Sequence, residues 1–153
     1  MTTMKATNKA VPDLYQRAVA YILTMPKTEK QMRQWYARKT MDQALIENDI
    51  ARLREYNFIN DEDYARNFVQ CKQDKLGIGQ IKNKLRMNGI NSAIIEKAVA
   101  EIDDQRALVQ ISVEKYLRHK DKTPEIKSKL FRWLLGKGFN YDVCVEVIDE
   151  NWH

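Results

Sequence analysis

IGQIKNKLRMNGINSAIIEKAV, residues 78–99, is one of three segments of this chain whose apolar positions are in register at a spacing of 49 residues. The preceding copy, EKQMRQWYARKTMDQALIENDI, occupies residues 29–50, and the following copy, KSKLFRWLLGKGFNYDVCVEVI, occupies residues 127–148. Six apolar positions recur in all three copies: Met32, Ile81 and Leu130; Tyr36, Leu85 and Leu134; Met41, Ile90 and Phe139; Leu45, Ile94 and Val143; Ile46, Ile95 and Cys144; Ile50, Val99 and Ile148. A fixed period of this length is typical of tandem structural repeats, so we expect three of them.

Each copy shows the apolar spacing of amphipathic helices. In the second copy, Tyr64, Ala65, Phe68 and Val69 form one stripe, and Asn60 stands before it as a helix N-cap. A break at Leu76-Gly77-Ile78-Gly79, and later Gly89, separate the helices that follow. With only 5 glycines and 3 prolines among 153 residues, the composition favours helices over a turn-rich β fold.

We therefore predict an all-α fold of three tandem three-helix repeats forming an elongated, curved array, of right or left hand. The expected divisions are a frayed N-terminus at 1–10 and repeats at 11–57, 58–103 and 104–153. A glycine, an apolar residue and an asparagine follow the second helix in two copies, at Gly89 and Gly138. The first copy has Thr40 in place of the glycine, which predicts a different turn there.

Charge is distributed by helix. The net charge of +5 is a mild excess, but the second helices are basic in all three copies and the third helices are acidic. If the repeats stack in one sense, a basic edge and an acidic edge run along the array. A basic stripe on a long scaffold suits a long anionic partner, such as nucleic acid or a protein filament formed on nucleic acid.

Enzyme chemistry finds little support. His119 and His153 are the only histidines, and no metalloprotease, phosphate-loop or nucleophile-elbow motif is present. The acids at residues 61–63 suit the first turn of a helix better than a metal site. We expect no catalytic residue, no cofactor and no metal.

The remaining single residues favour packing roles. Cys71 and Cys144 have no CxxC spacing, and we expect both to pack as small hydrophobic side chains. Trp35 and Trp133 occupy equivalent repeat positions; base stacking is one interpretation, and helix packing against the neighbouring repeat is the favoured one. No apolar run is long enough for a membrane span or a secretory signal, so we expect a cytoplasmic protein.

One segment is specific enough to suggest a family. INDEDYARNFV at residues 59–69, followed by Lys75-Leu76-Gly77, Gly79-Gln80-Ile81 and Gly89-Ile90, resembles the central signature of the RecX family, small bacterial regulators of the RecA recombinase. KLFRWLL at residues 129–135 and Lys137-Gly138-Phe139 also fit. The resemblance covers about residues 12 to 150, and it departs from the family pattern at Thr40-Met41.

The resemblance implies a non-enzymatic protein that binds RecA–DNA filaments, and we expect this protein to be a monomer. It would restrain their extension, ATP hydrolysis and strand exchange, and so temper recombination and the SOS response. We expect the contact with the filament, or with its single- or double-stranded DNA, to involve Lys72, Lys75, Lys82, Arg86, Lys127, Lys129 and Arg132.

Two alternatives remain open. One is a direct DNA-binding protein with helix-turn-helix pairs, which the acidic third helices oppose. The other is a scaffolding adaptor that neither binds DNA nor inhibits a recombinase.

Overall fold

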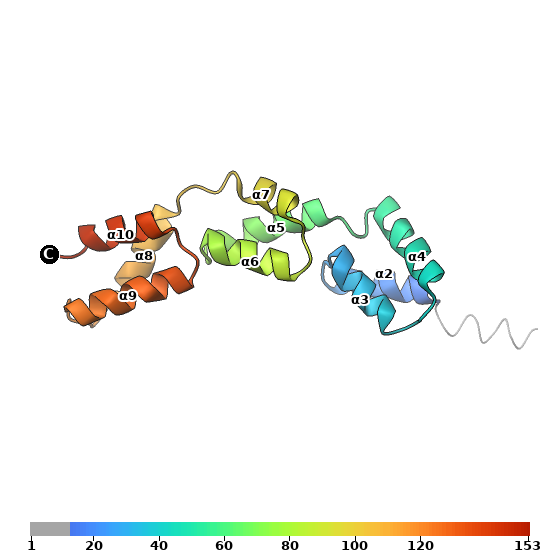
Figure 1. Cartoon of the computed structure of the whole chain (residues 1–153), viewed down its shortest axis with the longest axis horizontal. Coiled ribbons are helices and arrows are strands. Elements are labelled where there is room, and N and C mark those ends of the chain that lie inside the picture. The colour runs from blue at the N-terminus through green and yellow to red at the C-terminus, as the bar shows by residue number, and fades with distance from the viewer. Residues whose placement is uncertain (1–12) are drawn as a thin grey trace, which may run out of the picture. The chain divides into compact units, whose positions relative to one another are not determined.

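The computed structural model describes residues 13–153, and within that range it contains nine α-helices and no strand (Figure 1). The helices are α2 (Leu14–Thr24), α3 (Glu29–Ala37), α4 (Gln43–Glu55), α5 (Asp61–Lys72), α6 (Ile78–Met87), α7 (Ser92–Val99), α8 (Arg106–Leu117), α9 (Pro124–Gly136) and α10 (Tyr141–Glu150). The prediction of an all-α repeat fold is confirmed. The frayed segment expected at residues 1–10 lies outside the described residues.

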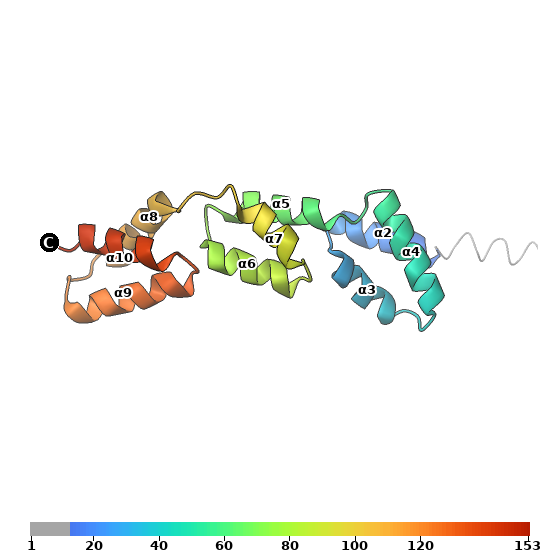
Figure 2. The ribbon, with the colours of Figure 1, turned by 45° about the horizontal axis from the view of Figure 1, so that its top comes forward.

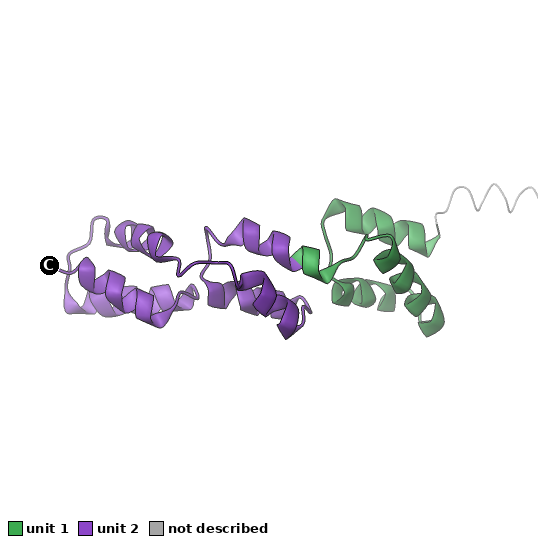
Figure 3. Ribbon diagram, turned by 90° about the horizontal axis from the view of Figure 1, so that it is seen from above, with its two compact units in different colours: residues 1–64 green, residues 65–153 purple. Residues whose placement is uncertain are grey.

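The helices group into two compact units, one ending at Tyr64 and the other spanning Ala65–His153 (Figure 3). The boundary falls inside α5. In the second unit, α7 lies against α6, and α10 lies against both α8 and α9 (Figure 2). None of the helices between residues 13 and 153 is long and apolar enough to cross a bilayer. The three repeat boundaries and the curvature of the array stay predictions.

Polar side chains cap the helices where the sequence places them. Thr28 Oγ1 accepts a hydrogen bond from the Gln31 N–H (3.1 Å), and Gln31 Oε1 accepts one from the Thr28 N–H (2.9 Å), which forms a capping box at the start of α3. Asn60 Oδ1 accepts from the Asp63 N–H (3.0 Å), as expected of an N-cap of α5. These bonds satisfy backbone donors that have no partner within the helix.

Asp61, in the acidic first turn of α5, makes a hydrogen bond to the start of α3. Its Oδ1 accepts a hydrogen bond from the backbone N–H of Glu29, at the start of α3 (3.0 Å). Burial raises the pKa of this carboxyl, and the Glu29 N–H partly opposes that rise. Asp61 thus ties α5 to α3 within the first unit.

Seventeen of the eighteen predicted repeat positions are buried or half-buried. Eight side chains at these positions are 0% exposed: Met32, Tyr36, Ile50, Ile81, Leu85, Leu130, Leu134 and Cys144. Burial raises the pKa of the Cys144 thiol to about 11, so this cysteine is a neutral core side chain at physiological pH. The expectation for Cys71 is wrong, because this residue is exposed on the outer face of α5.

The exception is Met41, which is 93% exposed and does not join the core as its equivalents do. Gly89 and Gly138 adopt φ values of 90° and 88°, a conformation that turns Ile90 and Phe139 inward. Thr40 is not among the residues with positive φ, because a β-branched side chain disfavours that region. The predicted difference in the first turn is therefore present, and it leaves Met41 in solvent.

A buried polar pair lies inside the first unit. The Tyr36 hydroxyl donates a hydrogen bond to Asp49 Oδ2 (2.9 Å); Tyr36 is fully buried and Asp49 is 6% exposed. Burial, together with the neighbouring carboxylate, raises the pKa of Tyr36 well above its usual value. The hydroxyl thus stays protonated and satisfies a carboxylate that is otherwise costly to bury.

In the second unit, the turn before α6 touches the turn after α9. The Gly77 N–H donates to the Lys137 carbonyl and the Gly79 N–H to the Gly138 carbonyl, both at 2.9 Å. A Cβ atom at Gly77 would lie 2.2 Å from the Gly138 carbonyl carbon, and one at Gly138 would lie 2.3 Å from the Gln80 backbone nitrogen. Only glycine fits this contact between the second and third repeats.

The side chain of Gln105 makes hydrogen bonds to the backbone of the turn between α5 and α6. Its side chain accepts from the Ile78 N–H (3.0 Å) and donates to the carbonyls of Gln73 (3.0 Å) and Leu76 (2.8 Å). The residue is 5% exposed and adopts a left-handed backbone conformation just before α8. One amide therefore satisfies three backbone groups of the α5–α6 turn, whose buried polar atoms need partners.

Replacing Tyr36 with phenylalanine is expected to lower the free energy of unfolding by about 2 kcal/mol, because Asp49 loses a hydrogen bond and stays buried. Urea titration followed by far-UV circular dichroism measures the change. Tyr56→Phe is the matched control, since Tyr56 is 64% exposed and its loss of a hydroxyl should change little. Equal stability of the two variants would show that the buried pair contributes nothing.

Replacing Gly136 or Gly138 with alanine is expected to change the stability of the protein in different ways. Gly138→Ala is expected to cost about 2 kcal/mol or more, because alanine is strained at positive φ and its Cβ meets backbone. Gly136→Ala should be neutral or stabilising by up to about 1 kcal/mol, because no atom lies within 4 Å of the added methyl. Thermal unfolding of both variants checks this order, and a Gly138→Ala protein as stable as wild type would contradict it.

Candidate partner-binding surface

All seven basic residues predicted to bind a partner lie in the second unit. Lys72 is the last residue of α5, and Lys75 is exposed in the turn before α6. The others are on second helices of the repeats: Lys82 and Arg86 on α6, and Lys127, Lys129 and Arg132 on α9. No described contact joins the α6 group to the α9 group.

On α6, the core face and the charged face are separate. Ile81 and Leu85 are fully buried, whereas Lys82 and Arg86, one helical turn apart, point away from the core. Lys82 Nζ lies 3.2 Å from Glu96 Oε1 on α7. Arg86 is exposed and makes no ion pair with any described residue, so its charge is available to a partner.

On α9, one of the three predicted cations is paired. Lys127 Nζ lies 3.2 Å from Asp149 Oδ1 on α10 and 5.8 Å from the centre of the Trp152 ring. Lys129 and Arg132 are exposed and have no ion-pair partner in the described part of the chain. The two groups therefore contribute Arg86, Lys129 and Arg132 as unpaired cations.

Lys72 has a basic neighbour that is not among the seven predicted binding residues. It lines a depression of about 300 Å³ with Lys84 and Met87 of α6. Met87 is 69% exposed, and Lys84 was not among the predicted binding residues. The basic composition of α6 includes Lys84, but only the packing of α6 beside the end of α5 places it next to Lys72.

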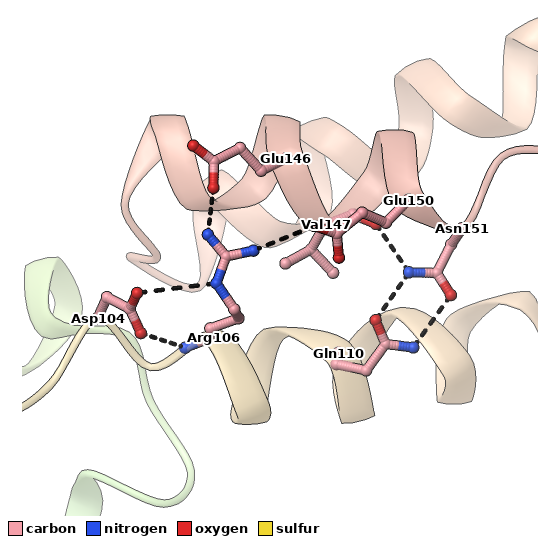
Figure 4. A network of polar contacts seen from close by, with 7 residues as sticks. All are labelled: Asp104, Arg106, Gln110, Glu146, Val147, Glu150 and Asn151. Carbon is pink, nitrogen blue, oxygen red and sulfur yellow. Dashed lines mark hydrogen bonds and ion pairs between the residues drawn. The ribbon is translucent and has the colours of Figure 1, made fainter.

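The acidic third helices are largely neutralised within their own repeats. Arg106, at the start of α8, pairs with Glu146 and Glu150 of α10 and with Asp104 (Figure 4). One turn further, Gln110 and Asn151 exchange two amide hydrogen bonds, of 2.7 and 3.0 Å. Asp149 pairs with Lys127, so three of the four acids of α10 already have a cation within this unit. The acidic edge predicted from the sequence is accordingly weakened at α10.

Both repeat-equivalent tryptophans pack inside their own repeats. Trp35 is 7% exposed, with the Tyr21 ring stacked at 5.8 Å, and Trp133 has the Tyr116 ring at 5.1 Å. Packing is thus the role of both, but against helices of the same repeat rather than the neighbouring one. Among residues 13–153, no group of three or more His, Cys, Asp or Glu side chains is placed to hold a metal ion.

Residues 60–99 match the model of the RecX second three-helix domain. The chain is 33% identical over 151 residues to "Regulatory protein RecX" of Clostridium botulinum (strain Eklund 17B / Type B), an alignment covering 95% of this chain and 71% of the relative. It is 35% identical over 128 residues to the protein of the same name from Clostridium beijerinckii, covering 80% of this chain and 60% of the relative.

The fold comparison agrees. The crystal structure of RecX from Lactobacillus salivarius superposes with a TM-score of 0.80 and 27% identity, covering 89% of this chain and 92% of that one. A second structure of a regulatory protein RecX, at 23% identity and a TM-score of 0.78, supports the fold alone. The signature at residues 59–69, the glycine turns and the aligned relatives together place this chain in the RecX family of regulatory proteins.

Proposed function

We propose that the chain binds RecA–DNA filaments and restrains their extension, ATP hydrolysis and strand exchange, thereby tempering recombination and the SOS response. It does so as a non-enzymatic cytoplasmic monomer, acting by binding alone. The observation that carries the proposal is that exposed cations on second helices, among them Arg86, Lys129 and Arg132, have no ion pair with a described residue, in a protein of a regulatory family. These side chains can meet acidic filament surface or the phosphates of the bound DNA.

The direct DNA-binding alternative requires the helix after the Gly89 turn, α7, to enter a groove of DNA. On α7, Glu96 is exposed, and among the described residues its charged partner is Lys82 of the same repeat. A carboxylate on a recognition helix opposes the approach of phosphates, so the filament is the favoured partner. A protein that bound only bare DNA would also lose affinity steeply with added salt and would need no recombinase.

DNA-dependent ATP hydrolysis by preassembled RecA filaments, titrated with this protein at fixed salt, tests the proposal. We expect inhibition at protein concentrations well below that of RecA. The double variant Lys82→Glu, Arg86→Glu should require about tenfold more protein for half-inhibition, since two cations at the interface become anions. Unchanged circular dichroism would show that the helices are intact.

The matched control is Arg17→Glu, Lys97→Glu, which makes the same change in net charge at exposed positions on α2 and α7. It should inhibit like wild type. Full inhibition by the Lys82, Arg86 variant would exclude the α6 face as a contact. No inhibition of preassembled filaments, together with inhibition when the protein is added to bare DNA before RecA, would support the direct DNA binder instead.

A further inference from the structure

An ion pair recurs at one repeat position and is missing from the third copy. Arg33 of α3 and Glu47 of α4 form two hydrogen bonds, of 2.5 and 3.1 Å. The residues 49 positions later are Lys82 and Glu96, whose charged atoms lie 3.2 Å apart. The hydrogen bond from Arg33 lowers the pKa of the Glu47 carboxyl, as expected for a charge-assisted pair. In these two repeats the pair bridges the outer faces of the second and third helices.

The third repeat has Phe131 and Val145 at the corresponding positions. Its ion pair is displaced by one helical turn on both helices, to Lys127 and Asp149. The place that a salt bridge covers in the first two repeats is thus lined by apolar side chains in the third.

A groove of about 360 Å³ opens at that place between α9 and α10. Phe131 and Val145 line it together with Ile148, and the Tyr141 ring, 60% exposed, meets the Phe131 ring edge-on at 5.1 Å. The rim holds the Lys127–Asp149 ion pair and Arg132, which is exposed and unpaired. The groove therefore offers apolar surface with one available positive charge at its edge.

We propose that this groove binds a segment of a partner protein that carries a large apolar side chain flanked by carboxylates. The apolar side chain would lie on Phe131, Val145 and Ile148, and a carboxylate would pair with Arg132. Burying an apolar anchor in a groove with a polar rim is the usual source of affinity for such segments. A phosphate backbone fits poorly, because Phe131, Val145 and Ile148 offer it no hydrogen-bond donor and Asp149 stands at the rim.

The assignment of that segment to RecA rests on the function proposed above, but the groove chemistry can be measured without RecA. We would titrate the full ¹⁵N-labelled chain with the synthetic peptide SEEFLSEES, up to millimolar concentration, and follow amide chemical shifts. The expected shifts are confined to α9 and α10. The peptides SKKFLSKKS and SEEAASEES should bind at least tenfold more weakly, because one lacks the carboxylates and the other the anchor.

The most direct test is the double variant Phe131→Arg, Val145→Glu, which introduces into the third repeat an ion pair at the position where the first two repeats have one. It should weaken binding of SEEFLSEES at least tenfold. Arg132→Glu, a change at an exposed side chain, serves if the double variant does not fold, and it should reverse the preference toward SKKFLSKKS. Ile111→Arg, on the exposed face of α8, is the control and should bind like wild type.

Three results would overturn the proposal: no shifts on α9 and α10, equal binding by wild type and the double variant, or self-association of wild type that the double variant abolishes. The last would make a second copy the occupant. The filament assay separates the two proposals. If wild type inhibits filaments normally but does not bind the peptide, the groove proposal is wrong and the proposed function stands. If wild type binds the peptide but does not inhibit filaments, the proposed function is wrong and the groove proposal stands.

Discussion

Backbone contact between two glycine turns joins the second and third repeats. Gly77 and Gly79 donate hydrogen bonds to the carbonyls of Lys137 and Gly138 at a distance that leaves no room for a Cβ atom. A three-helix repeat of fewer than fifty residues buries little apolar surface by itself, so such contacts between neighbours matter for stability. Gln105 reinforces the joint by satisfying the polar groups of the α5–α6 turn. Gly138, two residues after the end of α9, thereby orients α10 and contacts the start of α6.

Some of the charged side chains of this protein pair with one another, and others are left exposed for a partner. Lys82 and Lys127 form ion pairs with acidic residues of the third helices. Arg106 forms ion pairs with Glu146 and Glu150 of α10. Exposed pairs of this kind contribute little stability each, but they remove charges from the surface field. The cations of the two second helices that have no ion pair with a described residue include Arg86, Lys129 and Arg132. A partner that recognises this surface meets a small set of cations separated by neutralised stretches.

The repeats have diverged chemically on a common frame. The first has a buried Tyr36–Asp49 hydrogen bond and an exposed Met41, the second keeps the family signature, and the third has an apolar groove in place of an ion pair. The ion-pair positions can diverge in this way because they lie outside the core, whereas the core positions at the same period, with the exception of Met41, stay buried or half-buried. The third repeat therefore presents an apolar groove where the first two repeats have an ion pair.

The sequence by itself determined the helical class, the number of helices per copy and almost all of the core, because apolar periodicity and capping residues are local signals. It also indicated the unusual first turn at Thr40. Only the tertiary structure decided which charges are paired, why Met41 and Cys71 face solvent, and that Gln105 and Lys84 matter. These features depend on atoms that are far apart in the chain and meet only when helices pack. A charge count places a cation on a helix, but the packing of the neighbouring helix decides whether an acid lies within reach of it.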